Sequence, residues 1–372
     1  MSSDSITFRT HWESHPTKAA VAFSAMCRSH RRATDAVPSE TLTLHVVLAG
    51  AVVRMRIVGR ELAGRIGRPF RHLFLVGSPT RHDLAVDLWD ERVAGVPCPE
   101  SAERPDEGEP TAGDHDPPVT IGSPSDRCVG HLRPEILVWT DREAARLIGC
   151  APTADGLSIQ DRGKPLHFPL LLWHADRGIP IAHAALVSRE EQGILLVGKG
   201  GSGKTTAALA CLVGGLDFLA DDYVGLERTE DGLFVGHGLY DSSWLTADGE
   251  ARFPKLVPHL LPSERTATTV KRLIQLSDVA ADRLRRTARI GAVAITSLGA
   301  GPASSIRPVP KAEALLAVAP SSMLRLPISG PALLDRMTQL VDCVPTYRLE
   351  VGWDLAGVPP LVSELLGDGR RK

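Results

Sequence analysis

The residues best suited to chemistry stand in one short run, Gly198 to Thr205, which reads Gly-Lys-Gly-Gly-Ser-Gly-Lys-Thr. This run matches the phosphate-loop (Walker A) pattern G-x-x-x-x-G-K-[ST] in full. Glycines let backbone amides approach phosphate oxygens without a Cβ in the way. A helix that begins near Lys204 would aim its unpaired amides and positive dipole end at the same anion. The run therefore predicts a site for the polyphosphate of a nucleoside triphosphate.

Two side chains of the run have specific chemistry. The Lys204 ammonium is expected to neutralise the β- and γ-phosphates, and the Thr205 hydroxyl is expected to ligate magnesium. ATP and Mg²⁺ are therefore the expected cofactors. The residues predicted to bind the nucleotide are Gly198, Lys199, Gly200, Gly201, Ser202, Gly203, Lys204, Thr205 and Thr206.

The elements around the run agree with this interpretation. The apolar strand 193–197 precedes it, the helical segment 205–212 follows it, and two glycines at 214–215 are a plausible helix stop. A strand, an amide-rich loop and a helix in that order are what phosphate binding requires. The alternative is a glycine-rich turn with no ligand. The strand before the run and the helix after it argue against this alternative.

A pair of acids supplies the second group of candidates. Asp221 and Asp222 follow the apolar strand 216–220, 17 residues beyond Lys204, which is about the length of a crossover helix and a strand. That spacing predicts carboxylates at the carboxyl end of a strand near the phosphate loop. Such groups can hold a metal or accept a proton from an attacking hydroxyl. The alternative is a strand-ending turn whose acids face water.

His183 is a third candidate, in a strand predicted near 182–187. A lone histidine among small apolar residues is more often a core residue than a catalytic one, so its sequence context alone favours the structural role.

The rest of the chain predicts an α/β protein of two domains, because single cores usually stop growing near ~250–300 residues and this chain has 372. Segment 52–58 alternates apolar residues with arginine, as a half-buried strand does. Segment 97–126 is rich in Pro, Gly and acidic residues and predicts a loop. The expected division is a small N-terminal α/β domain at 1–96, a flexible loop or linker at 97–128, and a phosphate-loop catalytic domain at 129–372.

Composition limits the partners. The formal net charge of -2 gives no general attraction to nucleic acid or to anionic membranes. The six cysteines show no C-x-x-C spacing, so reduced thiols in a cytoplasmic protein are expected. The polar N-terminus lacks a secretory signal pattern.

The motifs, taken together, resemble those of HPr kinase/phosphorylase. Segments 181–187 and 219–224 and the phosphate loop occur in the same order and spacing as in the catalytic domain of that family, over roughly residues 150 to 360. The resemblance is closer to the HPr-kinase-related serine kinases of bacterial peptide-maturation clusters, including those for lasso peptides. These also carry a divergent N-terminal region, a Lys-Pro-Leu element like 164–166, and a Pro-x-x-x-Leu stretch like 345–349.

This resemblance implies the fold shared by HPr kinase and phosphoenolpyruvate carboxykinase. It implies that Asp221 is the base for the serine proton, and that Asp222 interacts with His183 and the metal-bound water, so that Thr205 and Asp222 are the metal-side residues. Two departures are evident. The Glu-x-Arg-Gly-x-Gly signature has no counterpart, which argues against phosphorylase activity and against HPr as the substrate. Trp244 stands where the related proteins are expected to have a lysine, and Lys271-Arg272 could supply that charge instead.

The sequence therefore predicts an ATP- and Mg²⁺-dependent kinase for a serine-type hydroxyl of a peptide or small protein, with Asp221, Asp222, His183 and Lys204 as catalytic residues. A small-molecule kinase or carboxykinase-like phosphotransferase is the first alternative. The second is a non-catalytic nucleotide-binding module that recruits a partner, although such a module has no need of the acidic pair. A homo-oligomer is compatible with the resemblance.

Overall fold

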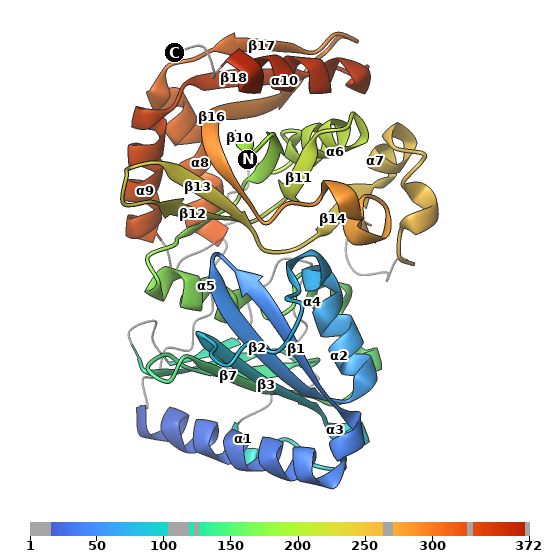
Figure 1. Cartoon of the computed structure of the whole chain (residues 1–372), viewed down its shortest axis with the longest axis vertical. Coiled ribbons are helices and arrows are strands. Elements are labelled where there is room, and N and C mark those ends of the chain that lie inside the picture. The colour runs from blue at the N-terminus through green and yellow to red at the C-terminus, as the bar shows by residue number, and fades with distance from the viewer. Residues whose placement is uncertain (1–15, 103–118, 123–125, 263–270, 326–329, 369–372) are drawn as a thin grey trace, which may run out of the picture.

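The structure is a computed structural model that describes residues 16–102, 119–122, 126–262, 271–325 and 330–368. It is a mixed α/β protein in which two large sheets, each with its own helices, follow one another along the long axis (Figure 1). In the part of the chain that is described, no helix is long and apolar enough to cross a membrane.

The first sheet has the strand order β1-β2-β3-β7-β6-β5-β4. Strand β3 is parallel to both of its neighbours, β2 and β7, and the other neighbouring pairs are antiparallel. The strands are β1 (Thr41–Leu48), β2 (Ala51–Val58), β3 (Leu84–Asp90), β4 (Val119–Ile121), β5 (Cys128–Leu132), β6 (Leu137–Asp141) and β7 (Arg146–Ala151).

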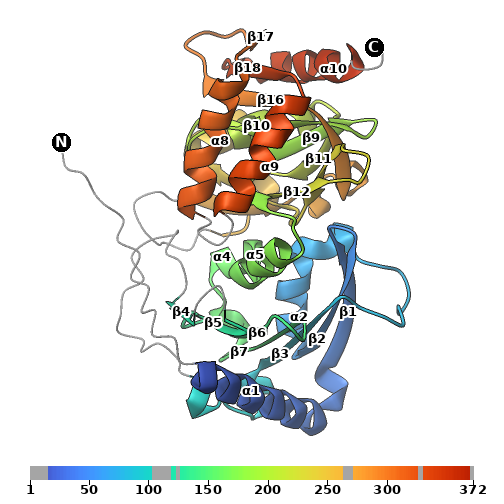
Figure 2. The same ribbon diagram turned by 90° about the vertical axis from the view of Figure 1, so that its left-hand side faces the viewer.

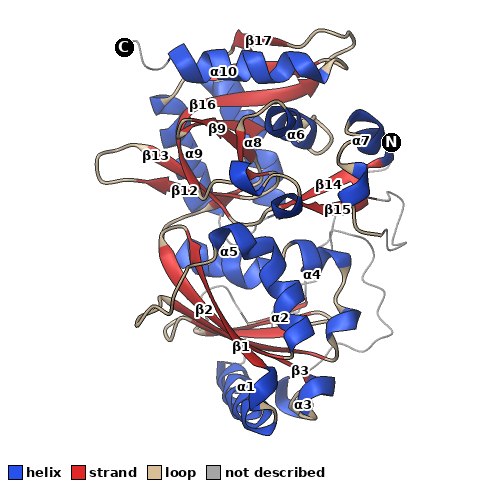
Figure 3. Cartoon of the chain, turned by 45° about the vertical axis from the view of Figure 1, so that its right-hand side comes forward, coloured by secondary structure: helices blue, strands red, loops and turns tan. Residues whose placement is uncertain are grey.

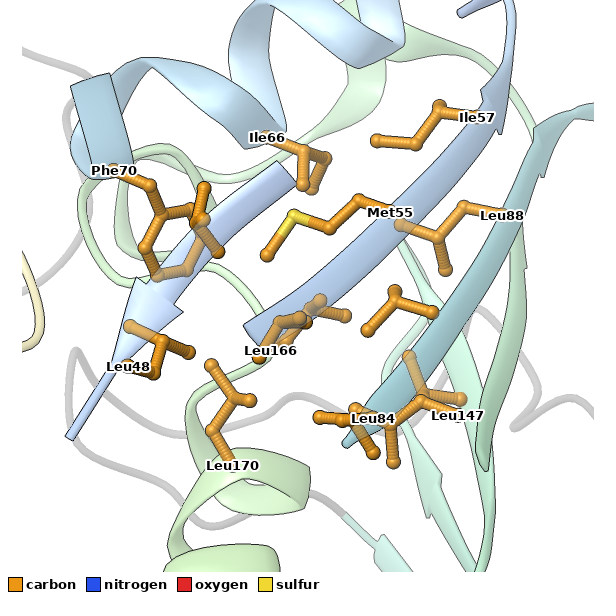
Figure 4. Close-up of a cluster of buried hydrophobic side chains, with 14 of the residues drawn as sticks. Leu48, Met55, Ile57, Ile66, Phe70, Leu84, Leu88, Leu147, Leu166 and Leu170 are labelled. Carbon is orange, nitrogen blue, oxygen red and sulfur yellow. The ribbon is translucent and has the colours of Figure 1, made fainter. Parts of the chain in front are cut away.

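Alternation along β2 decides how this sheet is covered. Val53, Met55 and Ile57 are fully buried on one face, and residues 52, 54 and 56 between them are half-buried, as the period-two pattern of the sequence predicted. The buried face packs against α2 (Arg60–Gly67) and α5 (His167–Asp176), where Ile66 and Leu170 reach the same cluster (Figure 4).

The opposite face of the first sheet packs on α1 (Pro16–Ala36), the helix at the bottom of Figure 1. Met26 of this helix is fully buried in a cluster with Trp89 and Trp139 of the sheet. The short helices α3 (Glu91–Ala94) and α4 (Ile159–Gly163) complete this half. The domain boundary expected at residue 129 falls inside this sheet, because β5, β6 and β7 pair into it. The first sheet thus extends to Ala151, and part of the segment expected to be a linker is strand.

The second sheet follows the path β11-β9-β10-β16-β13-β12-β8, with β18 added beside β16 and β17 beside β18. Its strands are β8 (Ile181–Ala182), β9 (Ala185–Arg189), β10 (Gln192–Val197), β11 (Asp217–Ala220), β12 (Val224–Arg228), β13 (Phe234–Gly238), β16 (Thr287–Leu298), β17 (Ser305–Pro308) and β18 (Thr346–Val351). A separate hairpin-like pair joins β14 (Ser242–Thr246) to β15 (Lys271–Gln275), near helix α7 (Ala247–Arg252).

Helices cover both faces of the second sheet, and Figure 2 shows α8 (Lys311–Arg325) and α9 (Gly330–Cys343) in front of the face that is turned to the viewer. Helices α6 (Lys204–Val213) and α10 (Val358–Asp368) contribute to one apolar cluster, and α8 and α9 contribute to another on the opposite face. Strand β10 and helix α6 were predicted within a residue or two, so the strand–loop–helix unit expected around the phosphate loop is present.

The two sheets are joined through helix α5 and the segment before it, which lie between them (Figure 3). The cluster that fills the first sheet also contains Ile181, Leu239 and Tyr240 from the second half. Polar contacts reinforce the junction: Asp278 is ion-paired with Arg68 and with Arg71. One apolar cluster therefore extends across the junction between the two halves.

Candidate active site

The phosphate loop, residues 198–203, connects β10 to α6. Gly198, Gly201 and Gly203 have φ of +144°, +76° and +95°, a region that residues with a Cβ rarely adopt. A Cβ added at Gly198 would lie 2.6 Å from Ser202 Oγ. The glycines predicted from the motif are therefore required by the backbone, and a side chain at position 198 would fill the loop.

Lys204 and the neighbouring strand hold the loop in place. The Lys204 side chain is 6% exposed, and its ammonium donates to the carbonyl oxygens of Gly198 at 2.7 Å and Lys199 at 3.2 Å. Ser202 and Thr296 share a hydrogen bond of 2.8 Å between their hydroxyl oxygens. A buried ammonium that lies against a glycine-rich loop at a helix N-terminus is suited to bind a polyphosphate, so these residues fit the predicted cofactor.

Strand directions bring the acids to the same edge as this loop. Strand β9 is antiparallel to both β10 and β11, so β10 and β11 run in the same direction. Strand β16 is parallel to β10 and to β18. The phosphate loop, Asp221, and the segments after β16 and β18 thus all follow carboxyl ends at one edge, where α/β sheets place ligands.

Two interrupted strands then position His183 and the acids. The strand predicted near 182–187 is broken at 183–184: its first part, β8, pairs with β12, and its second part, β9, pairs with β11. The chain from β11 to β12 is interrupted at the same level, at 221–223, and the amide of Ala184 donates to the carbonyl of Asp222 at 3.1 Å. His183 therefore sits in a break rather than in a regular strand, and Nε2 of its ring lies 3.5 Å from Asp222 Oδ1.

Asp222 also forms an ion pair with Lys164. The Asp222 side chain is 26% exposed, whereas those of Lys164 and His183 are 14% and 4% exposed. Burial opposes ionisation of Asp222, but the Lys164 ammonium and His183 outweigh it and hold the pKa of Asp222 well below its ordinary value. The negative charge of Asp222 is therefore balanced by Lys164 and His183.

Asp221 is in the opposite electrostatic situation. It is 3% exposed, and its Oδ2 accepts a hydrogen bond from the Ser243 hydroxyl. Burial and the neighbouring charge of Asp222 raise the pKa of Asp221 to about 6, against the opposing effects of Ser243, Thr205 and Lys164. Lys164 is ion-paired with Asp222 rather than with Asp221, and its charge only partly offsets the effect of burial on Asp221. Its interaction with Thr205 places it beside the first turn of α6.

Lys164 is the residue whose position sequence reasoning missed. The backbone around it is fixed from the second half: Ser242 Oγ donates to the Gly163 carbonyl at 2.7 Å, and Tyr240 Oη donates to the Pro165 carbonyl at 3.0 Å. The Lys164 ammonium lies 5.6 Å from the centre of the Trp244 ring. The Lys-Pro-Leu element was noted as part of the resemblance, but its contact with Asp222 crosses 58 residues of sequence and no spacing rule predicts it.

The same geometry bears on the lysine expected near position 244. Trp244 occupies that place and is 8% exposed, and the cation beside it comes from Lys164. Lys271 and Arg272 were the alternative source of this positive charge. Arg272, however, is ion-paired with Glu250 at 3.1 Å and donates to the carbonyls of Leu260 and Leu261. Arg272 therefore has a structural role, and Lys164 is the cation beside the acids.

Among the described residues no group of three or more His, Cys, Asp or Glu side chains could hold a metal ion. Magnesium that accompanies a nucleotide needs few protein ligands, since phosphates and water supply the rest. Thr205 and the acidic pair fit that limited role. Asp221 is the acid that interacts with Thr205, whereas Asp222 is engaged by Lys164 and His183.

A separate polar hollow of about 550 Å³ lies at the far edge of the second sheet. It is lined by the β9–β10 turn, the end of α6, the start of β11 and the segment before β16, and Asp217 of β11 is ion-paired there with Arg285 at 2.9 Å. None of the predicted site residues lines it.

Comparisons with known proteins add little to this geometry. No family model matches the chain, and no curated protein matches it. Among solved structures, the chain is similar to the Hpr(Ser) kinase/phosphatase from Coxiella burnetii, with 13% sequence identity and a TM-score of 0.28, over 51% of this chain and 90% of that one. The family expected from the motifs stays a prediction, and the site is interpreted from its own residues.

Proposed function

We propose that this protein is an ATP- and Mg²⁺-dependent kinase that phosphorylates a serine-type hydroxyl of a peptide or small protein. The observation that carries the proposal is a buried carboxylate with a raised pKa beside the predicted phosphate loop. Asp221 has a pKa of about 6 and interacts with the side chain of Thr205, in the first turn of the helix that follows the loop.

The loop residues bind and orient the nucleotide in this proposal. The amides of 198–203 and the first turn of α6 bind the phosphate oxygens, and the Lys204 ammonium exchanges its loop carbonyls for them. Bound ATP with magnesium supplies the transferable phosphoryl group and neutralises its charge. Catalysis then depends on positioning and electrostatics, because phosphoryl transfer needs little covalent help from the protein.

Asp221 accepts the proton of the acceptor hydroxyl at a carboxylate oxygen. A pKa of about 6 leaves it mostly ionised at pH 7, yet basic enough to take a proton as the hydroxyl oxygen attacks. Asp222 cannot share this task equally, because Lys164 and His183 hold its pKa so low that its carboxylate is a weak base. The two adjacent acids thus divide into a base and a fixed negative charge.

The acceptor approaches from the side where the two halves of the protein meet. Lys164 comes from the segment that joins the sheets, and Tyr223 and Trp244 flank its ammonium at 4.9 and 5.6 Å. These rings and the cation offer a peptide both an apolar and a charged contact. Substrate recognition at this junction is part of the proposal.

The test is to incubate the protein with γ-labelled ATP, magnesium and separate pools of serine-containing peptides and hydroxylated metabolites. Acid-stable label on peptide serine supports the proposal. Label that appears only on metabolites supports a small-molecule kinase instead. Tight ATP binding without transfer to either pool, in the presence of magnesium, supports a nucleotide-binding module and contradicts the kinase proposal.

A further inference from the structure

A second group of side chains borders the phosphate loop on the flank away from Lys164. Leu298, the last residue of β16, is 53% exposed, and Trp353, just after β18, is 61% exposed. Among the large apolar side chains exposed in the described parts of the chain, Trp353 is the aromatic one. An exposed tryptophan is expensive to leave in water, so its position next to a ligand site carries information.

Leu298 and the end of β18 are close to the start of α6. A Cβ added at Gly203 would lie 2.9 Å from Leu298 Cδ2 and 3.9 Å from Val351 Cγ2. Trp353 is two residues beyond Val351, so its Cα lies within about 8 Å of the Val351 Cα. Trp353 therefore follows directly after a strand whose last residue borders the start of α6.

The backbone around Trp353 is fixed. Its amide donates to the Gly301 carbonyl at 3.2 Å, and the next amide, of Asp354, donates to the Pro302 carbonyl at 3.0 Å. A Cβ at Gly352 would lie 2.2 Å from the Pro302 oxygen, so the two loops touch there. Because this backbone is already held in place, it needs no ordering when the indole binds a flat partner, which lowers the entropy cost of binding.

The direction of a bound nucleotide follows from the neighbours of the loop. On one flank, toward β11, lie Asp221 and the junction between the two halves, where the acceptor must enter. On the other flank lie the ends of β16 and β18, with Leu298 and Trp353. A nucleoside triphosphate whose terminal phosphate faces Asp221 therefore extends its base toward the second flank.

We propose that Trp353 and Leu298 form the platform on which the purine base of the nucleotide stacks. This inference rests on the proposed function, because it needs the triphosphate on the loop. Stacking of a base on an aromatic ring tolerates any base and adds affinity without touching the phosphates. The platform binds the nucleoside part of the ligand, and the loop binds the polyphosphate part.

The test is calorimetric titration of the full chain with Mg-ATP and, separately, with Mg-tripolyphosphate. For Trp353→Ala we expect about a tenfold weaker affinity for Mg-ATP, as for loss of one stacking contact, and no change for Mg-tripolyphosphate. Trp353→Phe keeps a ring and should stay within about threefold of the original protein. Leu316→Ala, which removes another exposed apolar side chain (72%) on α8, is the matched control and should change neither ligand.

The outcomes separate this inference from the kinase proposal. If the original protein binds Mg-ATP and Trp353→Ala binds it equally well, the platform is wrong and the proposed function stands. If Trp353→Ala weakens both ligands to the same extent, the residue supports the loop and the platform is again wrong. If the original protein binds neither ligand, the phosphate-loop assignment itself fails.

Discussion

Two buried aspartates, one in each sheet, show opposite ways of managing a charge in a protein interior. Asp87 lies on β3 of the first sheet with a side chain 2% exposed, and Arg146 and Arg54 reach it at 2.6 and 3.4 Å. Asp221 follows β11 of the second sheet, is equally buried, and accepts a hydrogen bond from the Ser243 hydroxyl. The first carboxylate is ion-paired with two cations, whereas the charge of Lys164 only partly offsets the burial of the second.

Under the proposed function, this difference separates a structural acid, Asp87, from a catalytic one, Asp221. A buried carboxylate between two guanidinium groups is satisfied as an anion, and its removal would leave the cations without their partner. A buried carboxylate without an ion-paired cation has a raised pKa and is ready to exchange a proton. Burial is common to both, so the presence of an ion-paired cation is the informative feature. Four substitutions can break or sharpen this comparison.

The largest effect is expected for Asp221→Asn. Loss of the proton acceptor should lower the rate of phosphoryl transfer about 10³-fold, while the affinity for Mg-ATP stays within about threefold. The melting temperature at pH 8 should be equal to or higher than that of the original protein, because a costly buried charge is removed. Transfer assays and calorimetry on one preparation measure both quantities; transfer at the normal rate would refute the base assignment.

The second prediction concerns Asp241, a third buried carboxylate, at the junction of the halves. Burial raises its pKa to about 7, against hydrogen bonds from Ser277. Between the unfolded value of about 3.9 and this folded value, the folded protein holds a proton that the unfolded chain has released. The free energy of unfolding should therefore fall as pH rises from about 4 to about 7, by up to about 4 kcal/mol from this group.

Asp241→Asn should remove this contribution to the fall. The free energy of unfolding of the variant should therefore increase relative to that of the original protein as pH rises. Denaturant unfolding at several pH values between 4 and 8 measures it. Asp282→Asn is the control, since that side chain is 83% exposed on a nearby segment. Parallel pH profiles for Asp241→Asn and the original protein would contradict the prediction. Asp241→Asn should keep its kinase activity above pH 7. This result would show that a raised pKa alone does not make a buried carboxylate catalytic.

The third prediction concerns Asp87→Asn. Leaving Arg54 and Arg146 without their carboxylate should lower the free energy of unfolding by about 3 kcal/mol, the low end for a broken buried pair, since both arginines are partly exposed. Where the protein is still folded, transfer per folded molecule should be unchanged. Asp248→Asn on the surface of α7 is the matched control. A loss of activity without a loss of stability would show that Asp87 takes part in catalysis and would contradict its structural role.

The smallest effect is expected for Lys164→Met. Removing the partner of Asp222 should lower kcat roughly tenfold, between the effects of exposed and buried charge pairs, with little change in the affinity for Mg-ATP. Lys164→Arg should recover most of the rate, because the charge is kept. Steady-state kinetics of both variants decide the point, and equal losses in the two would show that packing on Trp244 matters rather than charge.

The sequence was most informative where chemistry and backbone geometry coincide. The motif predicted a tight, glycine-dependent loop after the strand, and Gly198, Gly201 and Gly203 there have the positive φ values that glycine adopts easily. Strand β10, helix α6 and the placement of Asp221 after a strand were also predicted, because hydrophobic runs and turn residues are local signals.

Other features could not be predicted because they depend on long-range pairing. The interruption at 183–184 arises from a change of pairing partner between β8 and β9, which the apolar run 181–187 does not reveal. Strands β5 to β7 joined the first sheet across a segment whose composition indicated a linker. Helix α1 was missed, and its burial against Trp89 and Trp139 is likewise a tertiary contact.

The apolar cluster that extends across the junction has a consequence for how the molecule unfolds. Tyr240 and Ile181 bury their side chains among residues of the first sheet, so a cut after Ala151 would expose apolar surface on both fragments. Thermal unfolding should accordingly be a single cooperative event rather than two. A nucleotide held only by the second sheet would then protect the first sheet as well, since the free energy of binding is added to the one transition that both must undergo.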